Sequence, residues 1–281
     1  MLNRRRFLAA TAGSLLAAAA YTRLLEPTWL HVSHWQVPFF PSPAPSLPIL
    51  HLSDLHYSDV VPLRTIEQAI QLGLEQQPKL AFITGDFKSA ALPDYQAYVK
   101  CLRLLSSAVP TYACLGNHDY ETWRGPSKDV RTPQAPLIIP LLQGAGITLL
   151  RNESRLIQHQ GQSFNLIGLG DLWTSDCLPA QAFASIDPNL PSLLLSHNPD
   201  SKSLLSHLPW QLMLCGHTHG GQVKVPLFGA LHAPITDFRY IEGLNPYQQR
   251  WIYTTRGVGN LHGIRFNCRP EVSLLHLNPA S

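Results

Sequence analysis

Residue types that bind metal ions recur along this chain in short motifs of fixed order. Each motif comes directly after an apolar run that has the composition of a β-strand. The motifs are Asp54-Leu55-His56, Gly85-Asp86, Gly116-Asn117-His118-Asp119, the single His197, and Gly216-His217-Thr218-His219. Carboxylates and neutral imidazoles suit Mn²⁺, Fe²⁺ or Zn²⁺, and the absence of thiolates argues against a closed structural zinc site. Together the motifs supply enough ligands for two metal ions side by side.

The spacing of the first three motifs indicates how they come together. The steps from Asp54 to Asp86 and from Asp86 to Asn117 are nearly equal, and each matches the about 30 residues of a βαβ unit. Each step therefore carries the chain through one crossover. Right-handed crossovers return the next strand in parallel, and open α/β sheets bind ligands at the carboxyl ends of their strands. We therefore expect these three motifs to meet at one sheet edge, where the last two must also arrive.

Hydrophobic periodicity predicts the elements that position the motifs. Apolar runs predict strands at 49–53, 80–84, 111–115, 147–150, 164–169, 193–196, 212–215, 251–255 and 272–277. Helical spacing predicts helices at 63–76, at 95–106, from Thr132 and Pro133 to Gly144 or Gly146, and at 200–207. Early strand–helix alternation followed by strand-rich sequence predicts stacked mixed sheets covered by helices.

The N-terminus has the pattern of an export signal. Arg4-Arg5-Arg6 precedes an uncharged, Ala-rich run from Phe7 to Thr22, which is typical of a twin-arginine leader. Ala18-Ala19-Ala20 fits a cleavage site. The run is shorter than the ~20 residues that span a bilayer, yet it could persist as an anchor; a frayed N-terminal helix is the alternative. We expect a signal or anchor at 1–22, a Pro-rich linker at 23–48 and one folded domain at 49–278.

The charge balance excludes a nucleic-acid partner. The chain has 21 Lys and Arg against 18 Asp and Glu, and three of the arginines lie in the leader, which has no acidic residue. The remainder therefore counts 18 against 18, which leaves no basic footprint for nucleic acid.

The five cysteines form no Cys-x-x-Cys pair, which excludes a zinc ribbon. Cys114 and Cys215 lie in predicted buried strands and are expected to be core thiols. Export permits disulfides, so a bridge between Cys177 and Cys268 stays open.

The order of the motifs resembles the calcineurin-like metallophosphoesterases, over residues 49 to about 276. The strings Leu52–His56, Ser196-His197-Asn198-Pro199 and Cys215–Gln222 resemble more closely the bacterial exported branch of phosphodiesterases with a twin-arginine leader. This resemblance implies an α/β fold, a four-layer αββα sandwich of two mixed β-sheets flanked by helices. It makes residues 49–278 a calcineurin-like phosphoesterase domain.

The resemblance also implies a dinuclear metal site. One divalent ion would bind Asp54, His56, Asp86 and His219, and the other Asp86, Asn117, His197 and His217. Asp86 would bridge two ions, with Mn²⁺ as the first expectation and Fe²⁺, Zn²⁺ or a mixed pair as alternatives. A hydroxide shared by the ions would attack the phosphorus, without a covalent phosphoenzyme.

Further residues are candidates for contacts with the substrate. The resemblance places His118 near the leaving group, where an imidazole could supply about 10²–10⁴-fold as an acid, and Asp119 would fix its tautomer. Gly221 and Gln222 could bring backbone close to a phosphate, although a tight turn also explains the glycine. Arg256 could bind a second phosphate or a carboxylate.

Trp123 and Trp173 lie just after motifs or glycine turns. Either indole could contact an apolar substrate group or a membrane surface. Packing over the sheet rim is the alternative.

The residues after Asp86 indicate the class of ester. They are Phe87-Lys88-Ser89, whereas the protein-phosphatase branch continues Val-Asp-Arg-Gly. The missing arginine favours diesters or pyrophosphate-linked substrates over phosphoprotein monoesters.

The leader adds an expected location in the periplasm or on the outer side of the inner membrane, reached through the twin-arginine export machinery. We therefore expect a monomeric phosphodiesterase acting on a small or lipid-linked phosphate ester in the cell envelope, such as a nucleotide-linked lipid. The alternatives are a phosphomonoesterase of broad specificity and a non-catalytic metal-binding scaffold of the same fold.

Overall fold

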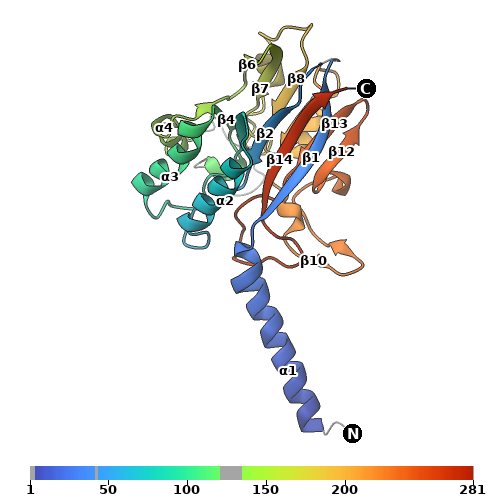
Figure 1. Ribbon diagram of the computed structural model, residues 1–281. Helices are drawn as coiled ribbons and strands as arrows, with labels where there is room; N and C mark the ends of the chain where they lie inside the picture. Colours follow the sequence, from blue (N-terminus) through green and yellow to red (C-terminus); the bar gives the residue numbers. More distant parts are fainter. Residues whose placement is uncertain (1–3, 42–43, 121–134, 281) are drawn as a thin grey trace.

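Two six-stranded mixed sheets form the centre of the computed structural model, which describes residues 4–41, 44–120 and 135–280 (Figure 1). The first sheet has the order β1-β14-β2-β3-β4-β5, with strands β1 (His31–Phe40), β2 (Leu47–Leu52), β3 (Leu80–Thr84), β4 (Thr111–Cys114), β5 (Thr148–Leu149) and β14 (Glu271–Pro279). The second has the order β12-β13-β9-β8-β7-β6, with strands β6 (Glu153–His159), β7 (Gln162–Gly168), β8 (Ser192–Leu195), β9 (Leu212–Cys215), β12 (Gly243–Tyr247) and β13 (Arg250–Thr254).

Helices cover the outer face of the first sheet. They are α2 (Leu63–Glu75), α3 (Tyr95–Ala108) and α4 (Ile138–Gly144), and their apolar faces pack in one cluster with β2, β3 and β4. Asp94 begins α3 as its N-cap, because its carboxylate accepts a hydrogen bond from the Ala97 N–H at 2.9 Å. The predicted start of the third helix at Thr132 and Pro133 lies outside the described residues.

The outer face of the second sheet carries a thinner layer. It consists of α5 (Pro179–Ala182) and short 3₁₀ turns at Pro199–Ser203 and Phe238–Tyr240, packed around the buried Trp210. Between the sheets, Ile49 and Phe82 of the first meet Leu193 and Leu212 of the second in a separate apolar cluster. The structure therefore confirms two mixed sheets flanked by helices.

The strand order confirms the crossovers that the motif spacing predicted. β2, β3 and β4 are parallel neighbours, with Ile49 opposite Leu80 and Ala81 opposite Thr111. In the second sheet β8, β9 and β13 are parallel neighbours as well. The loops after β2, β3, β4, β8 and β9 hold the motifs, so the fold brings the motifs to the carboxyl ends of strands in both sheets.

Residues 31–40 differ from the expected linker. They form β1, which pairs in parallel with β14 from His31 opposite Glu271 onward, and Val37 and Phe40 are buried between the sheets. The proline content suggested an extended spacer, but β1 is an edge strand, and an edge strand tolerates Pro38 because no neighbour needs its missing N–H. The folded body therefore begins before residue 49.

The N-terminal segment is helical. α1 (Arg4–Ala20) projects from the body, and a π-helical turn at Tyr21–Leu25 and a 3₁₀ turn at Glu26–Thr28 join it to β1 (Figure 1). Among the described helices, none combines the length and apolarity needed to cross a membrane.

The cysteines are free thiols in this structure. Cys114 and Cys215 are buried, as expected for core residues. Cys177 and Cys268 are also unpaired, so the bridge that the sequence left open is not formed here.

Candidate metal centre

Two groups of buried carboxylates and imidazoles meet where the strands of both sheets end. One group is Asp54, His56 and His219, and the other is Asp86, His197 and His217. Within each group, one candidate ligand atom from each residue lies within 4.8 Å of the others. Asp54, His56 and Asp86 follow strands of the first sheet, whereas the other three imidazoles follow strands of the second. The site therefore lies at the junction of the sheets.

Asp86 stands between the two groups. Its Oδ2 lies 3.4 Å from Nε2 of His56 and 3.2 Å from Nε2 of His197. Its Oδ1 accepts a hydrogen bond from the His118 N–H at 2.8 Å, which fixes the carboxylate plane. This position is the one that a bridging ligand requires.

Hydrogen bonds on the far side of the rings orient three of the imidazoles. Nδ1 of His197 donates to the Thr84 carbonyl at 2.7 Å, and Nε2 of His217 donates to the Pro234 carbonyl at 3.1 Å. Nδ1 of His56 is hydrogen-bonded to Oγ of Ser89 at 2.8 Å. The remaining nitrogens turn inward, where His217 Nδ1 lies 3.1 Å from His197 Nε2. Such outer partners select the tautomer whose inward lone pair can bind a metal.

Burial sets the charge of most of these groups. It lowers the pKa of His56 to about 3 and the pKa of His217 and His219 well below the ordinary value. These rings are therefore neutral, which is the form that binds metals. Burial also raises the pKa of Asp54 to about 6.

His197 and Asp86 behave as a pair. Burial alone would lower the pKa of His197, but the adjacent Asp86 carboxylate raises it to about 10. Burial likewise opposes the ionised form of Asp86, yet the charges of His197 and His118 hold its pKa well below the usual range. A divalent cation can take the place of that proton on His197, so metal binding and proton release are coupled here.

The donor set fits two divalent cations. Asn117 Oδ1 is buried without a hydrogen-bond partner, and leaving such an atom unpaired is costly unless something else binds it. Asn117 directly follows Gly116, at which a Cβ would stand 2.3 Å from Oδ1 of Asp86. The amide is thus carried on the loop that touches Asp86. Oxygen and imidazole donors without thiolates match Mn²⁺, Fe²⁺ or Zn²⁺.

Several candidate ligands have unusual backbone conformations. Asp54, His56, Asp86, His217 and His219 have φ angles of 52°, 50°, 54°, 71° and 51°. Side chains other than glycine rarely adopt this left-handed region, and such strain gathers at functional sites. The unusual backbone therefore coincides with the candidate ligands of both groups.

His118 and Asp119 take separate positions. The His118 ring is partly exposed, and its centroid lies 5.1 Å from that of His56. We expected Asp119 to fix the His118 tautomer. Its carboxylate instead accepts backbone N–H bonds from Asp86 at 2.9 Å, Phe87 at 2.7 Å and Gly116 at 2.8 Å. Asp119 therefore ties the second and third motif loops together and is a positioning residue.

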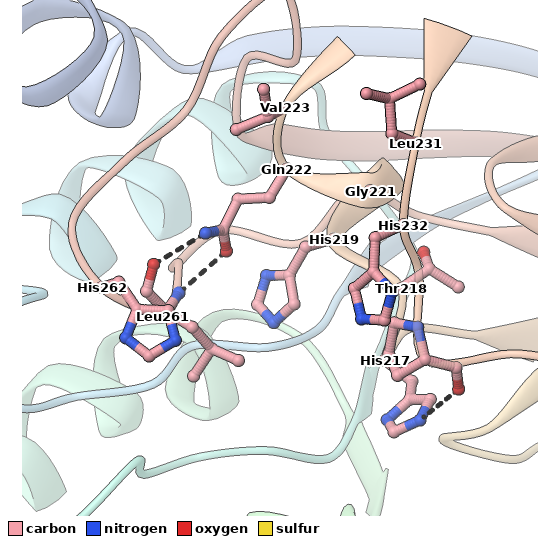
Figure 2. A pocket seen from close by; sticks show the side chains of 11 residues that line it. His217, Thr218, His219, Gly221, Gln222, Val223, Leu231, His232, Leu261 and His262 are labelled. Atoms are coloured by element: carbon pink, nitrogen blue, oxygen red, sulfur yellow. Dashed lines mark hydrogen bonds between the residues drawn. The ribbon is translucent and has the colours of Figure 1, made fainter. Parts of the chain in front are cut away.

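A pocket opens beside His217 and His219 (Figure 2). Its volume is about 390 Å³, and Val223, Leu231 and Leu261 contribute apolar walls. Figure 2 also shows how Gln222 is used: its amide donates to the Leu261 carbonyl at 2.7 Å and accepts from the Leu261 N–H at 2.9 Å. Gln222 thus braces the pocket wall, which Gly221 also lines.

Arg256 does not line the pocket beside His217 and His219. Its Nη2 lies 3.1 Å from Nδ1 of His31 and 3.4 Å from Oε1 of Glu271. The guanidinium lines a separate polar depression together with Tyr21 and Arg269. His31 of β1 and the Glu271 carboxylate thus lie beside the guanidinium, and the contact with a substrate phosphate or carboxylate stays a prediction.

The structure describes one of the two candidate tryptophans, Trp173. The Trp173 ring packs edge-on against His217, with centroids 4.3 Å apart, so it supports a candidate ligand. Trp123 lies outside the described residues.

Sequence reasoning missed several supporting residues. Ser89 holds His56, and the buried Lys88 donates to the His118 carbonyl at 2.9 Å. Arg265 is fully buried and donates to the carbonyls of Arg256 at 2.7 Å and Cys268 at 2.9 Å. Nothing local marks these residues, although Lys88 and Ser89 directly follow the second motif.

The fold and the two clusters of candidate metal ligands define a metallohydrolase, and the comparisons agree. The chain belongs to the calcineurin-like phosphoesterase family, whose model matches residues 47–221. The chain is similar to phosphodiesterase YaeI of Escherichia coli, with 45% identity over 99% of this chain and 100% of that protein. UDP-2,3-diacylglucosamine pyrophosphatase LpxG of Chlamydia trachomatis is 27% identical over 93% of this chain and 94% of its own length. The uncharacterized metallophosphoesterase YkuE of Bacillus subtilis is 27% identical over 98% of both chains. The protein is a metal-dependent phosphoester hydrolase with two candidate metal-binding sites.

Proposed function

We propose that the protein hydrolyses a phosphodiester or a pyrophosphate-linked substrate with two divalent metal ions. The observation that carries this proposal is the position of Asp86, whose Oδ2 lies within 3.4 Å of an imidazole from each ligand group. Asp54, His56 and His219 would hold one ion, and Asn117, His197 and His217 the other, with Asp86 shared. Bound ions supply Lewis acidity and lower the pKa of a water so that it can act as the nucleophile.

The chain's own residues complete the site. Asp119 and Lys88 hold the loop of His118, so the partly exposed His118 imidazole stays beside the ligand groups. From there it can give a proton to the departing alkoxide. Neutral, buried imidazoles and strained ligand loops preorganise the donors before the substrate arrives.

The residue at position 88 supports diesters over monoesters. Lys88 is buried and its Nζ is bound to the His118 carbonyl, so this cation is not directed at a substrate. A monoester dianion needs more positive charge than a diester monoanion. The relative named as a phosphodiesterase and the relative named as a pyrophosphatase agree with this class.

The apolar pocket supports a substrate with an apolar or lipid-linked group. His217 and His219 line part of the pocket, and Val223, Leu231 and Leu261 are among its other lining residues (Figure 2). A phosphate bound at the ligand groups would leave room there for such a substituent. Together with the Arg4-Arg5-Arg6 pattern, this favours an envelope substrate reached after export by the twin-arginine machinery.

The test compares bis(p-nitrophenyl) phosphate and p-nitrophenyl phosphate on one sample of full-length protein, with Mn²⁺ and after chelation. We expect Mn²⁺-dependent turnover that is faster for the diester. Faster turnover of the monoester would support the monoesterase alternative. Absence of turnover of either ester by folded, metal-loaded protein would support the scaffold.

A further inference from the structure

The β10–β11 hairpin carries large apolar side chains into solvent next to the pocket. It consists of β10 (Lys224–Val225) and β11 (Gly229–Ala230), joined by the turn at 226–228. Leu227 and Phe228 at the tip are 104% and 76% exposed, and Leu231 beyond it is 70% exposed. Leu231 also lines the pocket, so the exposed apolar surface continues into the pocket wall.

Hydrogen bonds connect this hairpin to the base of α1 through the loop at 262–266. At the root of the hairpin, the Lys224 N–H donates to the Phe266 carbonyl at 2.8 Å. In the same loop, the Arg265 N–H donates to the Thr22 carbonyl at 3.0 Å, and Arg23 Nη1 donates to the His262 carbonyl at 3.1 Å. Figure 1 shows the hairpin and the start of the body beside α1 at the same edge of the molecule.

Exposed large apolar side chains lie on each of these connected segments. We name these side chains the apolar rim: Leu24, Leu25, Leu227, Phe228, Leu231 and Ile264. An exposed patch of large apolar side chains at the edge of a pocket marks an interaction surface.

The backbone conformation at the tip of the hairpin is unfavourable for the leucine that occupies it. Leu227 has a φ of 69°, in the left-handed region where glycine or asparagine is the ordinary choice. A leucine at this position is disfavoured by its backbone and again by its complete exposure to water. Burial of the side chain in an apolar medium would remove the second penalty.

The charges beside the rim indicate what that medium is. Residues 223–236 contain no Asp or Glu, and Arg23 is exposed at the base of α1. An apolar helix with arginines at its start leaves the body at this same edge. Apolar tips with basic neighbours are the features of surfaces that enter the boundary between lipid headgroups and acyl chains.

We propose that the apolar rim docks on a lipid bilayer, with the tip of the hairpin inserted among the acyl chains. The pocket then faces the membrane, and Leu231 joins the inserted tip to the pocket wall. This surface interaction does not depend on which ester the protein cleaves.

The test places a nitrobenzoxadiazole (NBD) fluorophore on the rim of the full-length protein, in a Cys177→Ser background because Cys177 is a free thiol that is not buried. Phe228→Cys and Leu24→Cys carry the label on the rim, whereas Leu104→Cys and Leu156→Cys are matched controls at exposed leucines on α3 and β6. The probe is a vesicle of phosphatidylethanolamine and phosphatidylglycerol, with and without acyl-chain nitroxides. Turnover of a soluble diester and the melting temperature confirm that each labelled protein is folded.

We expect several-fold brighter, blue-shifted NBD emission at positions 24 and 228 with vesicles, and quenching there by the nitroxides. Positions 104 and 156 should not change. A response at 24 without one at 228 would overturn the proposal, because α1 alone would then explain binding. Emission at 228 that shifts with protein concentration in lipid-free buffer would also overturn it, since the tip would then bind a second copy.

Discussion

Oδ2 of Asp86 lies 3.2 Å from Nε2 of His197, and this contact joins a loop of the first sheet to a loop of the second. The same oxygen lies 3.4 Å from His56, which belongs to the other ligand group. The carboxylate therefore couples the end of β3 to the end of β8, two strands that lie far apart in the chain. One side chain therefore contacts both halves of the candidate centre.

Asp86→Asn should impair binding of both metal ions. The amide keeps the size of the side chain but removes the negative charge that both groups share. We expect diester turnover to fall by more than about 100-fold and the metal content per chain to fall below that of the wild type. Elemental analysis and kinetics on the same sample measure both. Asp94→Asn is the control, because asparagine also caps α3; a variant that kept both ions would argue against the bridging role.

His118→Ala should separate chemistry from metal binding. The His118 ring is partly exposed and is no member of either ligand group. We expect the variant to retain its metals while kcat for a diester falls about 10²–10⁴-fold. If the ring protonates the leaving group, the loss should be larger for an alkyl leaving group than for p-nitrophenolate. Unchanged kcat would remove His118 from the mechanism.

Ser89→Ala should weaken metal binding without emptying the site. Oγ of Ser89 lies 2.8 Å from Nδ1 of His56 and holds the ring with its other nitrogen inward. Loss of an outer hydrogen bond of this kind lowers metal affinity by about 10–100-fold. Titration of metal-free protein with Mn²⁺, followed by calorimetry, gives the affinity. Ser206→Ala, whose hydroxyl contacts the Ser203 carbonyl, should bind Mn²⁺ like the wild type.

His51 should make metal-free protein sensitive to acid. Burial lowers the pKa of His51 from 6.5 to about 3, and its Nε2 is hydrogen-bonded to Oγ1 of Thr84 at 2.8 Å. The unfolded chain therefore takes up a proton at higher pH than the folded chain does. This contribution to stability is complete above pH 6.5 and is lost as the pH falls from 6.5 toward 3.

The experiment compares the wild type with His51→Gln, which lacks the titrating ring. Urea unfolding at about pH 7.5 and about pH 5 should show the wild type losing about 2 kcal/mol more than the variant. Equal losses would mean that protonation of His51 does not contribute to the acid sensitivity of the folded protein.

The sequence by itself determined the ligand types, their order and their arrival at one edge. The nearly equal steps between the first three motifs match the βαβ units formed by β2, α2, β3, α3 and β4. Predicted and observed strand ranges agree for 80–84 and 212–215. At each of the other predicted strands, one or both ends differ by one or two residues. Such features are local, because a continuous stretch of sequence shows the hydrophobic period of a helix or strand and the length of a crossover.

Only the tertiary structure decided how the site is held and where the outer residues point. β1 lies in the sheet because β14, from the opposite end of the chain, offers it an edge along which His31 pairs with Glu271. The backbone carbonyl of His219 accepts from Arg265, Asp119 binds N–H groups of two loops, and Arg256 turns toward His31. These contacts join segments that are far apart in the sequence and have no local pattern in common. They form only once the sheets have packed and the buried polar groups need partners.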